Sequence, residues 1–175
     1  RSSGIQVKGG PRWQQICAFY DQLDSHRAPL ELPKTLQADL KPYQKVAVQW
    51  LSDIYQLGLG GILADDMGLG KTVTTLAFLE HLRVQNKMGQ VLIVVPTSLT
   101  YNWVSETQRF TPGIPIHIFQ SKFQDQALDF MRDNPNCILL TTYGLLQEQA
   151  AFFDQVSWQV QVFDEAQNLK NISAK

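Results

Sequence analysis

Residues 61–72, Gly61-Ile62-Leu63-Ala64-Asp65-Asp66-Met67-Gly68-Leu69-Gly70-Lys71-Thr72, decide the fold of this chain. The apolar stretch Ile62 to Ala64 predicts a strand, and the residues that follow Gly70 predict a helix. Between them, Gly-Leu-Gly-Lys-Thr is typical of a phosphate-binding loop, although Asp65 stands where the general pattern has glycine. The glycines let backbone N–H groups curve around phosphates, Lys71 supplies a positive charge, and Thr72 offers a hydroxyl to Mg²⁺. The pattern alone also fits a tight turn before a helix.

The rest of the chain alternates between strand and helix patterns. Apolar, β-branched runs predict strands over 91–95, 114–119, 137–141 and 160–163, and helical spacing predicts helices over 43–57, 71–84, 102–110, 124–131 and 145–153. Such alternation predicts an α/β fold, in which a parallel sheet is flanked by helices on both faces. Ligands of such folds bind at the carboxyl ends of the strands.

The first 35 residues do not follow this alternation. Helical spacing predicts a short amphipathic helix over 13–23, and the prolines at 29 and 33 predict an extended connector after it. We therefore expect an N-terminal helix and connector over residues 1–35 and the main domain over residues 36–175.

The composition excludes several classes of protein. A chain of 175 residues with 44% hydrophobic residues is long enough for about one globular domain. Its longest purely apolar run, Val91 to Val95, is far shorter than the roughly 18 residues of a membrane span. A net charge of -1 provides no basic stripe that would by itself indicate nucleic-acid binding. The two cysteines, Cys17 and Cys137, indicate neither a disulfide scaffold nor a zinc module, and they suit a reducing compartment.

Two carboxylates, Asp164 and Glu165, follow the last predicted strand. In P-loop hydrolases such an aspartate holds the Mg²⁺ shell, and a neighbouring glutamate orients and deprotonates the attacking water. An Asp-Glu pair after a strand is also typical of a solvated turn. Its position beyond the phosphate loop and the alternating strands favours the catalytic interpretation.

Several segments, in order, resemble successive motifs of the Swi/Snf helicase-like ATPases of helicase superfamily two. They are Leu40-Lys41-Pro42-Tyr43-Gln44, Asp65 to Thr72, Val95-Pro96-Thr97-Ser98-Leu99 with Asn102-Trp103, Leu140-Thr141-Thr142-Tyr143-Gly144, and Asp164-Glu165-Ala166-Gln167-Asn168. The resemblance covers residues 36–175. It also accounts for Asp65, because the first motif of this family resembles Asp-x-Met-Gly-Leu-Gly-Lys-Thr. The last segment resembles bacterial members most closely.

The resemblance implies a RecA-like lobe that binds ATP with Mg²⁺, and it assigns roles to individual residues. Gln44 resembles the glutamine that reads adenine, and Glu165 resembles the carboxylate that activates water. Gln167 resembles a sensor of the nucleotide state. The residues implied to bind the nucleotide are Met67, Gly68, Leu69, Gly70, Lys71 and Thr72. Thr72 and Asp164 are implied to bind Mg²⁺, and Lys71 and Asp164 are implied to take part in catalysis besides Glu165. The residues implied to contact the nucleic-acid backbone are Pro96, Thr97, Ser98, Asn102, Thr141 and Thr142.

The implied nucleotide-binding residues end at Thr72. The chain has no second threonine directly after it, because position 73 holds a valine, Val73. We therefore expect no nucleotide contact from the side chain at position 73.

The resemblance also implies a second RecA-like lobe in the parent chain, with ATP clamped between the lobes. The second lobe supplies arginines to the transition state, and no arginine of this chain lies in a segment that resembles such a motif. We therefore expect the chain by itself to bind ATP and Mg²⁺ but to hydrolyse ATP poorly.

Three functions stay open at this point. The first is an ATP-driven translocase on double-stranded DNA that remodels protein–DNA complexes without separating strands. The second is a nucleotide-gated module that acts on a protein partner, such as a DNA-bound protein or RNA polymerase. The third is an unrelated P-loop kinase, which the absence of a lid-like arginine cluster disfavours. The first two place the parent in the bacterial cytoplasm, at the nucleoid, or in the nucleus of a eukaryote.

Overall fold

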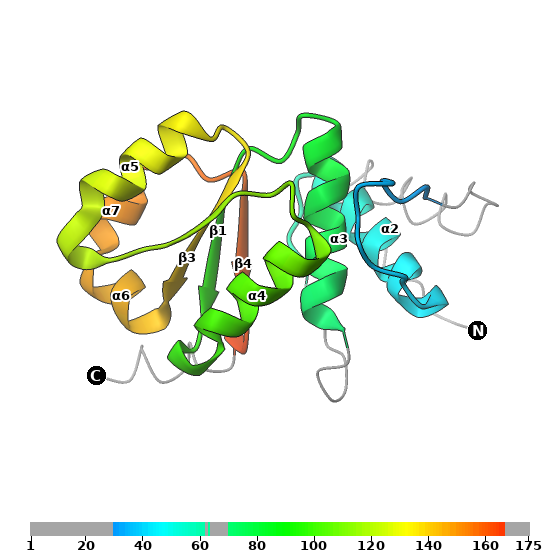
Figure 1. The fold of residues 1–175 in the computed structure, drawn as a ribbon, viewed down its shortest axis with the longest axis horizontal. Coiled ribbons are helices and arrows are strands. Elements are labelled where there is room, and N and C mark those ends of the chain that lie inside the picture. Colours follow the sequence, from blue (N-terminus) through cyan, green and yellow to red (C-terminus); the bar gives the residue numbers. More distant parts are fainter. Residues whose placement is uncertain (1–29, 62, 64–69, 167–175) are drawn as a thin grey trace, which may run out of the picture.

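Four parallel strands form the centre of the computed structural model, which describes residues 30–61, 63 and 70–166. The strands are β1 (Gln90–Val95), β2 (Ile116–Ile118), β3 (Cys137–Thr142) and β4 (Val160–Phe163), in the spatial order β2-β3-β1-β4 (Figure 1). Because all neighbouring strands are parallel, their carboxyl ends share one edge of the sheet. The segments that follow β1, β3 and β4 therefore lie near one another.

Helices cover both faces of this sheet, as the sequence predicted (Figure 1). They are α2 (Pro42–Gln56), α3 (Lys71–Val84), α4 (Thr100–Phe110), α5 (Gln124–Asp133), α6 (Tyr143–Glu148) and α7 (Ala150–Asp154), with short 3₁₀ turns at Thr97–Leu99 and Ser121–Phe123. Across the described ranges, no helix combines the length and apolar character that crossing a membrane requires.

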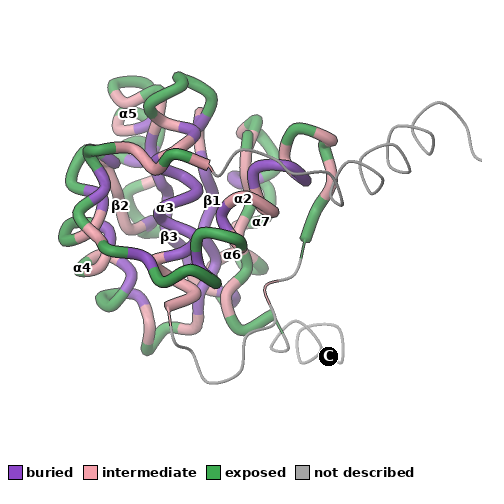
Figure 2. The backbone as a smooth tube through the Cα atoms, turned by 90° about the vertical axis from the view of Figure 1, so that its right-hand side faces the viewer, coloured by how far each residue is buried: buried purple, intermediate pink, exposed green. Residues whose placement is uncertain are grey.

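The residues of β1 alternate between two hydrophobic cores. Val91, Ile93 and Val95 face the core formed with α2, α3 and α4. Leu92 and Val94 face the second core, to which α5 and α7 contribute. Every residue from Val91 to Val95 is buried, which explains why this strand reads as a continuous apolar run (Figure 2).

The structure corrects some expected boundaries. The helix expected over 145–153 is two helices, α6 and α7, because the backbone leaves the helical conformation at Gln149. The side chain of Gln149 accepts a hydrogen bond from Gln124 Nε2 at 2.8 Å, which fixes this break to the start of α5. The strand expected over 114–119 pairs only over Ile116–Ile118.

Other expectations fall wholly or partly outside the described residues. The helix expected over 13–23 is one of them. Of the strand expected before the phosphate loop, only Leu63 is described, and it belongs to no strand. The sheet observed here is therefore formed entirely by strands that follow the phosphate loop.

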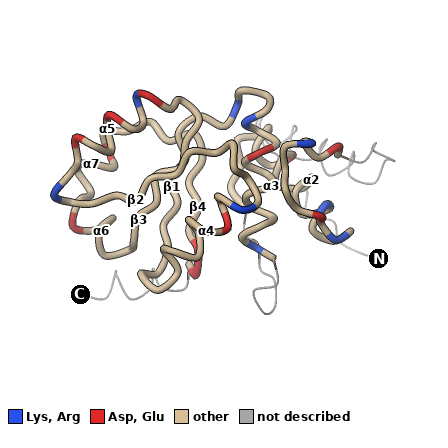
Figure 3. Tube along the Cα trace, viewed as in Figure 1, with Lys and Arg blue, Asp and Glu red and all other residues tan. Residues whose placement is uncertain are grey.

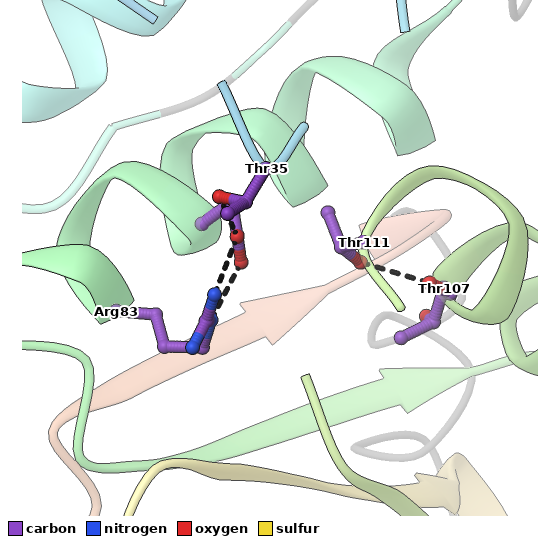
Figure 4. A network of polar contacts seen from close by, with 5 residues as sticks. Thr35, Arg83, Thr107 and Thr111 are labelled. Atoms are coloured by element: carbon purple, nitrogen blue, oxygen red, sulfur yellow. Dashed lines mark hydrogen bonds and ion pairs between the residues drawn. The ribbon is translucent and has the colours of Figure 1, made fainter. Parts of the chain in front are cut away.

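A buried ionic network ties the connector before α2 to α3 (Figure 4). Glu80 is completely buried, accepts hydrogen bonds from Arg83 Nε and Nη2 at 2.8 and 2.7 Å, and accepts another from Thr35 Oγ1 at 2.5 Å. Gln37 N also donates to Phe110 O at 2.8 Å, at the end of α4. The last residue of the expected connector, Thr35, is thus bound to α3, and the chain just after it is bound to α4.

Candidate nucleotide site

The N-terminus of α3 presents the described part of the predicted phosphate loop. Gly70 has φ +91°, a left-handed conformation that favours glycine, and the helix begins directly after it. Lys71 and Thr72 lie half-buried in the first turn, where unpaired backbone N–H groups and the helix dipole attract anions. Met67, Gly68 and Leu69 lie outside the described residues. The observed half of the loop suits a phosphate ligand.

The residue after Thr72 belongs to the core and not to the ligand side of the loop. Position 73 is Val73 and not a threonine, so it offers no hydroxyl to a nucleotide or to Mg²⁺. Its half-buried side chain packs against the core that α3 forms with β1. A side chain at position 73 is therefore left out of the candidate site, and the ligands from the first turn of α3 end at Thr72.

Gln44 lies directly against this helix start. Its side chain is buried at 7% exposure, and its Oε1 accepts a hydrogen bond from Lys41 N at 2.8 Å, which closes the first turn of α2. A Cβ added at Gly70 would lie only 2.0 Å from Gln44 Nε2. The amide that the sequence assigned to adenine is therefore adjacent to the helix that begins with Lys71. This is the packing of α2 beside α3 that such a role requires.

The carboxylate of Asp164 is held at the end of β4. Its backbone N–H donates to Val94 O at 2.9 Å, which continues the pairing with β1. Its side-chain Oδ2 accepts a hydrogen bond from the indole Nε1 of Trp103 at 2.9 Å. Trp103 comes from α4 and is almost completely buried, so Asp164 is oriented by a rigid partner.

The next residue, Glu165, is exposed and has φ +53°. A left-handed backbone at a non-glycine residue costs of order 1–3 kcal/mol and is frequent at functional sites. The conformation turns the chain after β4, directly beyond Asp164.

Negative charge gathers around this position. Burial raises the pKa of Tyr143, and the charges of Asp164 and Glu165 raise it further. Burial also raises the pKa of Glu106 on α4, and the charge of Asp164 adds to this, although Asn102 and Arg109 act in the opposite direction. The end of β4 therefore carries a local excess of negative charge, which suits a bound cation.

The donor set fits Mg²⁺ better than a metal held by protein alone. Within the described ranges no group of three or more His, Cys, Asp or Glu residues could hold a metal ion. Mg²⁺ is usually bound through one or two carboxylates, waters and the phosphates of a nucleotide. Asp164 and the hydroxyl of Thr72 would hold it here, and it would neutralise charge on the phosphates.

Comparison with known families identifies the family of the chain. The model of the SNF2-related domain matches residues 43–175. The chain belongs to this family. The match spans the segments that hold Gln44, Lys71 and Asp164.

Individual members of the SNF2 family are similar to the chain over most of its length. It is 38% identical over 155 residues to the chromatin-remodeling ATPase INO80 of Arabidopsis thaliana, which covers 83% of this chain and 10% of the relative. It is 36% identical over 148 residues to the helicase swr1 of Emericella nidulans, with coverage of 82% and 9%. The chain thus spans about a tenth of the length of these relatives.

A solved structure agrees with the fold. The chain resembles the SWI2/SNF2 ATPase core of Sulfolobus solfataricus in complex with double-stranded DNA, with a TM-score of 0.73 and 35% identity. The match covers 85% of this chain and 30% of that one. The RecA-like lobe that the sequence predicted is therefore confirmed.

The predicted nucleic-acid residues of this SNF2 domain differ in exposure. Thr97, Ser98 and Asn102 are exposed after β1, and Pro96 is half-buried. Thr142 is half-buried, and its Oγ1 accepts a hydrogen bond from Leu145 N at the start of α6. Thr141 is buried at 2% exposure. The segment after β1 is thus the more accessible one, and Gln167 lies outside the described residues.

Sequence reasoning missed two aromatic partners of Asp164. Trp103 and Tyr143 belong to segments that resemble family motifs, but neither of them was assigned a role from the sequence. The hydroxyl of Tyr143 donates to the backbone oxygen of Asp164 at 2.5 Å. Their proximity in sequence to the nucleic-acid segments was the available signal, but the contacts with Asp164 join residues 61 and 21 positions apart and depend on the fold.

Proposed function

We propose that this chain is the first RecA-like lobe of an ATP-dependent translocase that moves on double-stranded DNA and remodels protein–DNA complexes without separating the strands. The observation that carries this proposal is the meeting of three segments at one sheet edge. The acidic pair follows β4 there, Thr97 and Ser98 follow β1, and Thr141 and Thr142 form the end of β3. A nucleotide site and a nucleic-acid surface would then share the same short loops.

The distribution of charge supports weak contacts with DNA. In the described part of the chain, lysine and arginine are scattered over the surface rather than gathered into one stripe (Figure 3). A lobe that steps along DNA has to release successive phosphates, and hydroxyls and backbone amides can contact them without the strong salt dependence of a basic patch. The exposed Thr97 and Ser98 suit such contacts.

The residues of this chain divide the chemistry between them. Lys71 and the first turn of α3 bind the phosphates, and Gln44 reads the adenine. Asp164 and Thr72 would hold Mg²⁺, which would neutralise charge on the phosphates, and Glu165 orients the attacking water and accepts its proton. Gln167 senses the nucleotide, and a second RecA-like lobe completes the site with arginines.

The relatives suggest the kind of target. INO80 is named a chromatin-remodeling ATPase, and the structural neighbour holds double-stranded DNA. We therefore expect the parent protein to act on a DNA-bound protein, of which RNA polymerase is one example. The bacterial origin suggested by residues 164–168 stays a prediction, since the relatives described above are eukaryotic or archaeal. A bacterial parent would act at the nucleoid, and a eukaryotic one in the nucleus.

ATP hydrolysis by the full-length protein tests the proposal. Duplex DNA should stimulate hydrolysis severalfold, and the protein should displace the third strand of a triplex while it leaves a forked duplex paired. Stimulation by a protein partner without DNA would instead favour a nucleotide-gated module. Phosphate transfer to a small acceptor would indicate a kinase.

A further inference from the structure

Two aromatic side chains connect the predicted nucleic-acid segments to the acidic pair. Trp103 follows the segment 96–102, and its indole N–H donates to Asp164 Oδ2 at 2.9 Å. Tyr143 follows Thr141 and Thr142, and its hydroxyl donates to Asp164 O at 2.5 Å. Each segment thus ends in one hydrogen bond to the same residue.

The two bonds constrain different groups. Trp103 binds the carboxylate of Asp164 itself. Tyr143 binds the carbonyl of the peptide that joins Asp164 to Glu165, and Glu165 has the strained φ of +53°. Rotation of this peptide would redirect the Glu165 side chain. One aromatic residue therefore controls the predicted metal ligand, and the other controls the direction of the predicted base.

Both aromatic side chains are buried and packed in a hydrophobic core. Trp103 is 2% exposed and Tyr143 is 8% exposed, and each packs in one of the two cores. Trp103 lies in the first turns of α4, which begins three residues after the exposed Thr97. Tyr143 is the first residue of α6. A small shift of either helix start would move its hydrogen-bond donor with it.

We propose that Trp103 and Tyr143 are positioning residues that couple nucleic-acid contact to the geometry of Asp164 and Glu165. This inference rests on the proposed function. When the backbone of DNA engages the segment after β1 and the end of β3, the starts of α4 and α6 become fixed. The two hydrogen-bond donors then hold both carboxylates in the arrangement for hydrolysis. Neither aromatic residue needs to touch the nucleotide.

Substitutions that remove only the hydrogen bond test the proposal in the full-length protein. Trp103→Phe and Tyr143→Phe retain an aromatic ring. Loss of a residue that orients a metal ligand typically costs about 10- to 100-fold in metal affinity or activity. We expect each variant to lower the DNA-stimulated kcat and the ratio of stimulated to basal hydrolysis, while KM for ATP and the affinity for DNA change about 2-fold or less. Trp103→Phe should also raise the Mg²⁺ concentration required for half-maximal binding of ADP, measured by calorimetry without turnover.

The chain offers matched controls at other positions. Trp158 Nε1 donates to Phe153 O at 2.9 Å, and Tyr55 OH donates to Lys87 O at 3.0 Å. Trp158→Phe and Tyr55→Phe lose the same kinds of donated bond, and Tyr55→Phe also loses the bond that its hydroxyl accepts from Gln159 Nε2. Both controls should keep the wild-type ratio of stimulated to basal hydrolysis. An equally large fall in the ratio of stimulated to basal hydrolysis in the control variants would overturn the proposal, because it would show that aromatic substitutions in general lower this ratio.

A second measurement addresses folding defects. The indole ¹⁵N–H resonance of Trp103 in the wild-type protein should shift when Mg²⁺ and ADP are added, and it should shift again when duplex DNA is added. A resonance whose chemical shift stays the same in both titrations would contradict the coupling. Full stimulation in Trp103→Phe and Tyr143→Phe, with a stimulated wild type, would overturn this inference alone. A wild-type protein that duplex DNA does not stimulate would overturn the proposed function.

Discussion

At the scale of single residues, Glu165 and Lys71 should respond differently to substitution. Glu165→Gln keeps the size of the side chain but removes the base, so we expect ATP binding to stay near the wild-type level while hydrolysis falls by about 10² to 10⁴. Lys71→Ala removes the charge that faces the phosphates and should weaken binding as well. Filter binding of ATP beside steady-state kinetics separates the two effects, and equal loss of binding in both variants would refute this division of roles.

Gln44 should determine the choice of base. A side-chain amide can accept from adenine N6 and donate to N7, whereas guanine presents an acceptor at O6, and such a paired contact is worth about 1–3 kcal/mol. Gln44→Ala should therefore narrow the preference for ATP over GTP about 5- to 150-fold, with DNA affinity unchanged. The ratio of kcat/KM for the two nucleotides measures this. Substitution of the exposed Gln147, on α6, is the control, and an unchanged ratio in Gln44→Ala would assign Gln44 a purely structural role.

At the scale of secondary-structure elements, the buried Glu80 should make the attachment of the connector depend on pH. Burial acts to raise the pKa of its carboxyl, but hydrogen bonds from Arg83 and Thr35 and the charge of Arg83 lower the pKa overall. A carboxyl whose pKa is lower in the folded state stabilises the fold above its unfolded pKa, which is about 4.3. That contribution is lost as the pH falls through the folded pKa.

Urea unfolding of Glu80→Gln tests this network. At pH 7 the loss of charged hydrogen bonds should cost about 1–3 kcal/mol. The difference from the wild type should shrink as the pH falls below about 4.3, where the wild-type carboxyl gains a proton. Glu148→Gln changes an exposed glutamate and should have little effect at any pH. A difference for Glu80→Gln that is independent of pH would contradict the linkage.

The elements themselves were largely predictable, and their tertiary contacts were not. Periodicity located α2 and β1, because each has a strong pattern and a clear stop. The break at Gln149 was invisible, since apolar spacing continues through it and the cause is a contact with Gln124. The candidate site was likewise predictable only in part. The motifs identified Gln44 and Asp164 in the sequence, but only the packing shows that the Gln44 amide lies against Gly70 and that the Trp103 indole binds Asp164.

At the scale of the whole molecule, the thiol of Cys137 should report on global opening. The residue is completely buried in β3, and burial raises its pKa to about 11. At pH 8 both its inaccessibility and its protonation oppose alkylation. We expect iodoacetamide to label Cys137 only at a rate set by unfolding, which mass spectrometry of the peptide can follow over a urea series. Rapid labelling under native conditions would contradict the observed packing.

The chain by itself should be a poor catalyst. Among the described arginines, Arg83 binds Glu80, Arg132 pairs with Asp129 and Asp133, and Arg109 lies over the ring of Phe110. An arginine supplied to the transition state is worth about 10³ to 10⁵ in kcat. We therefore expect the 175-residue chain to hydrolyse ATP slower than the full-length protein by about this factor. Comparable single-turnover rates would show that one lobe suffices.

The position of β4 at the border of the sheet has a consequence for handling the protein. Within the described residues β4 has β1 on one side and no strand on the other. Its sequence, Val160-Gln161-Val162-Phe163, contains no charge and no proline, the usual protections of an exposed strand, and Phe163 is 37% exposed. Main-chain groups on such a border can pair with a further strand, including one from a neighbouring molecule. Light scattering of concentrated solutions of the wild-type chain and of Gln161→Lys would show whether a second copy of the chain pairs with this border.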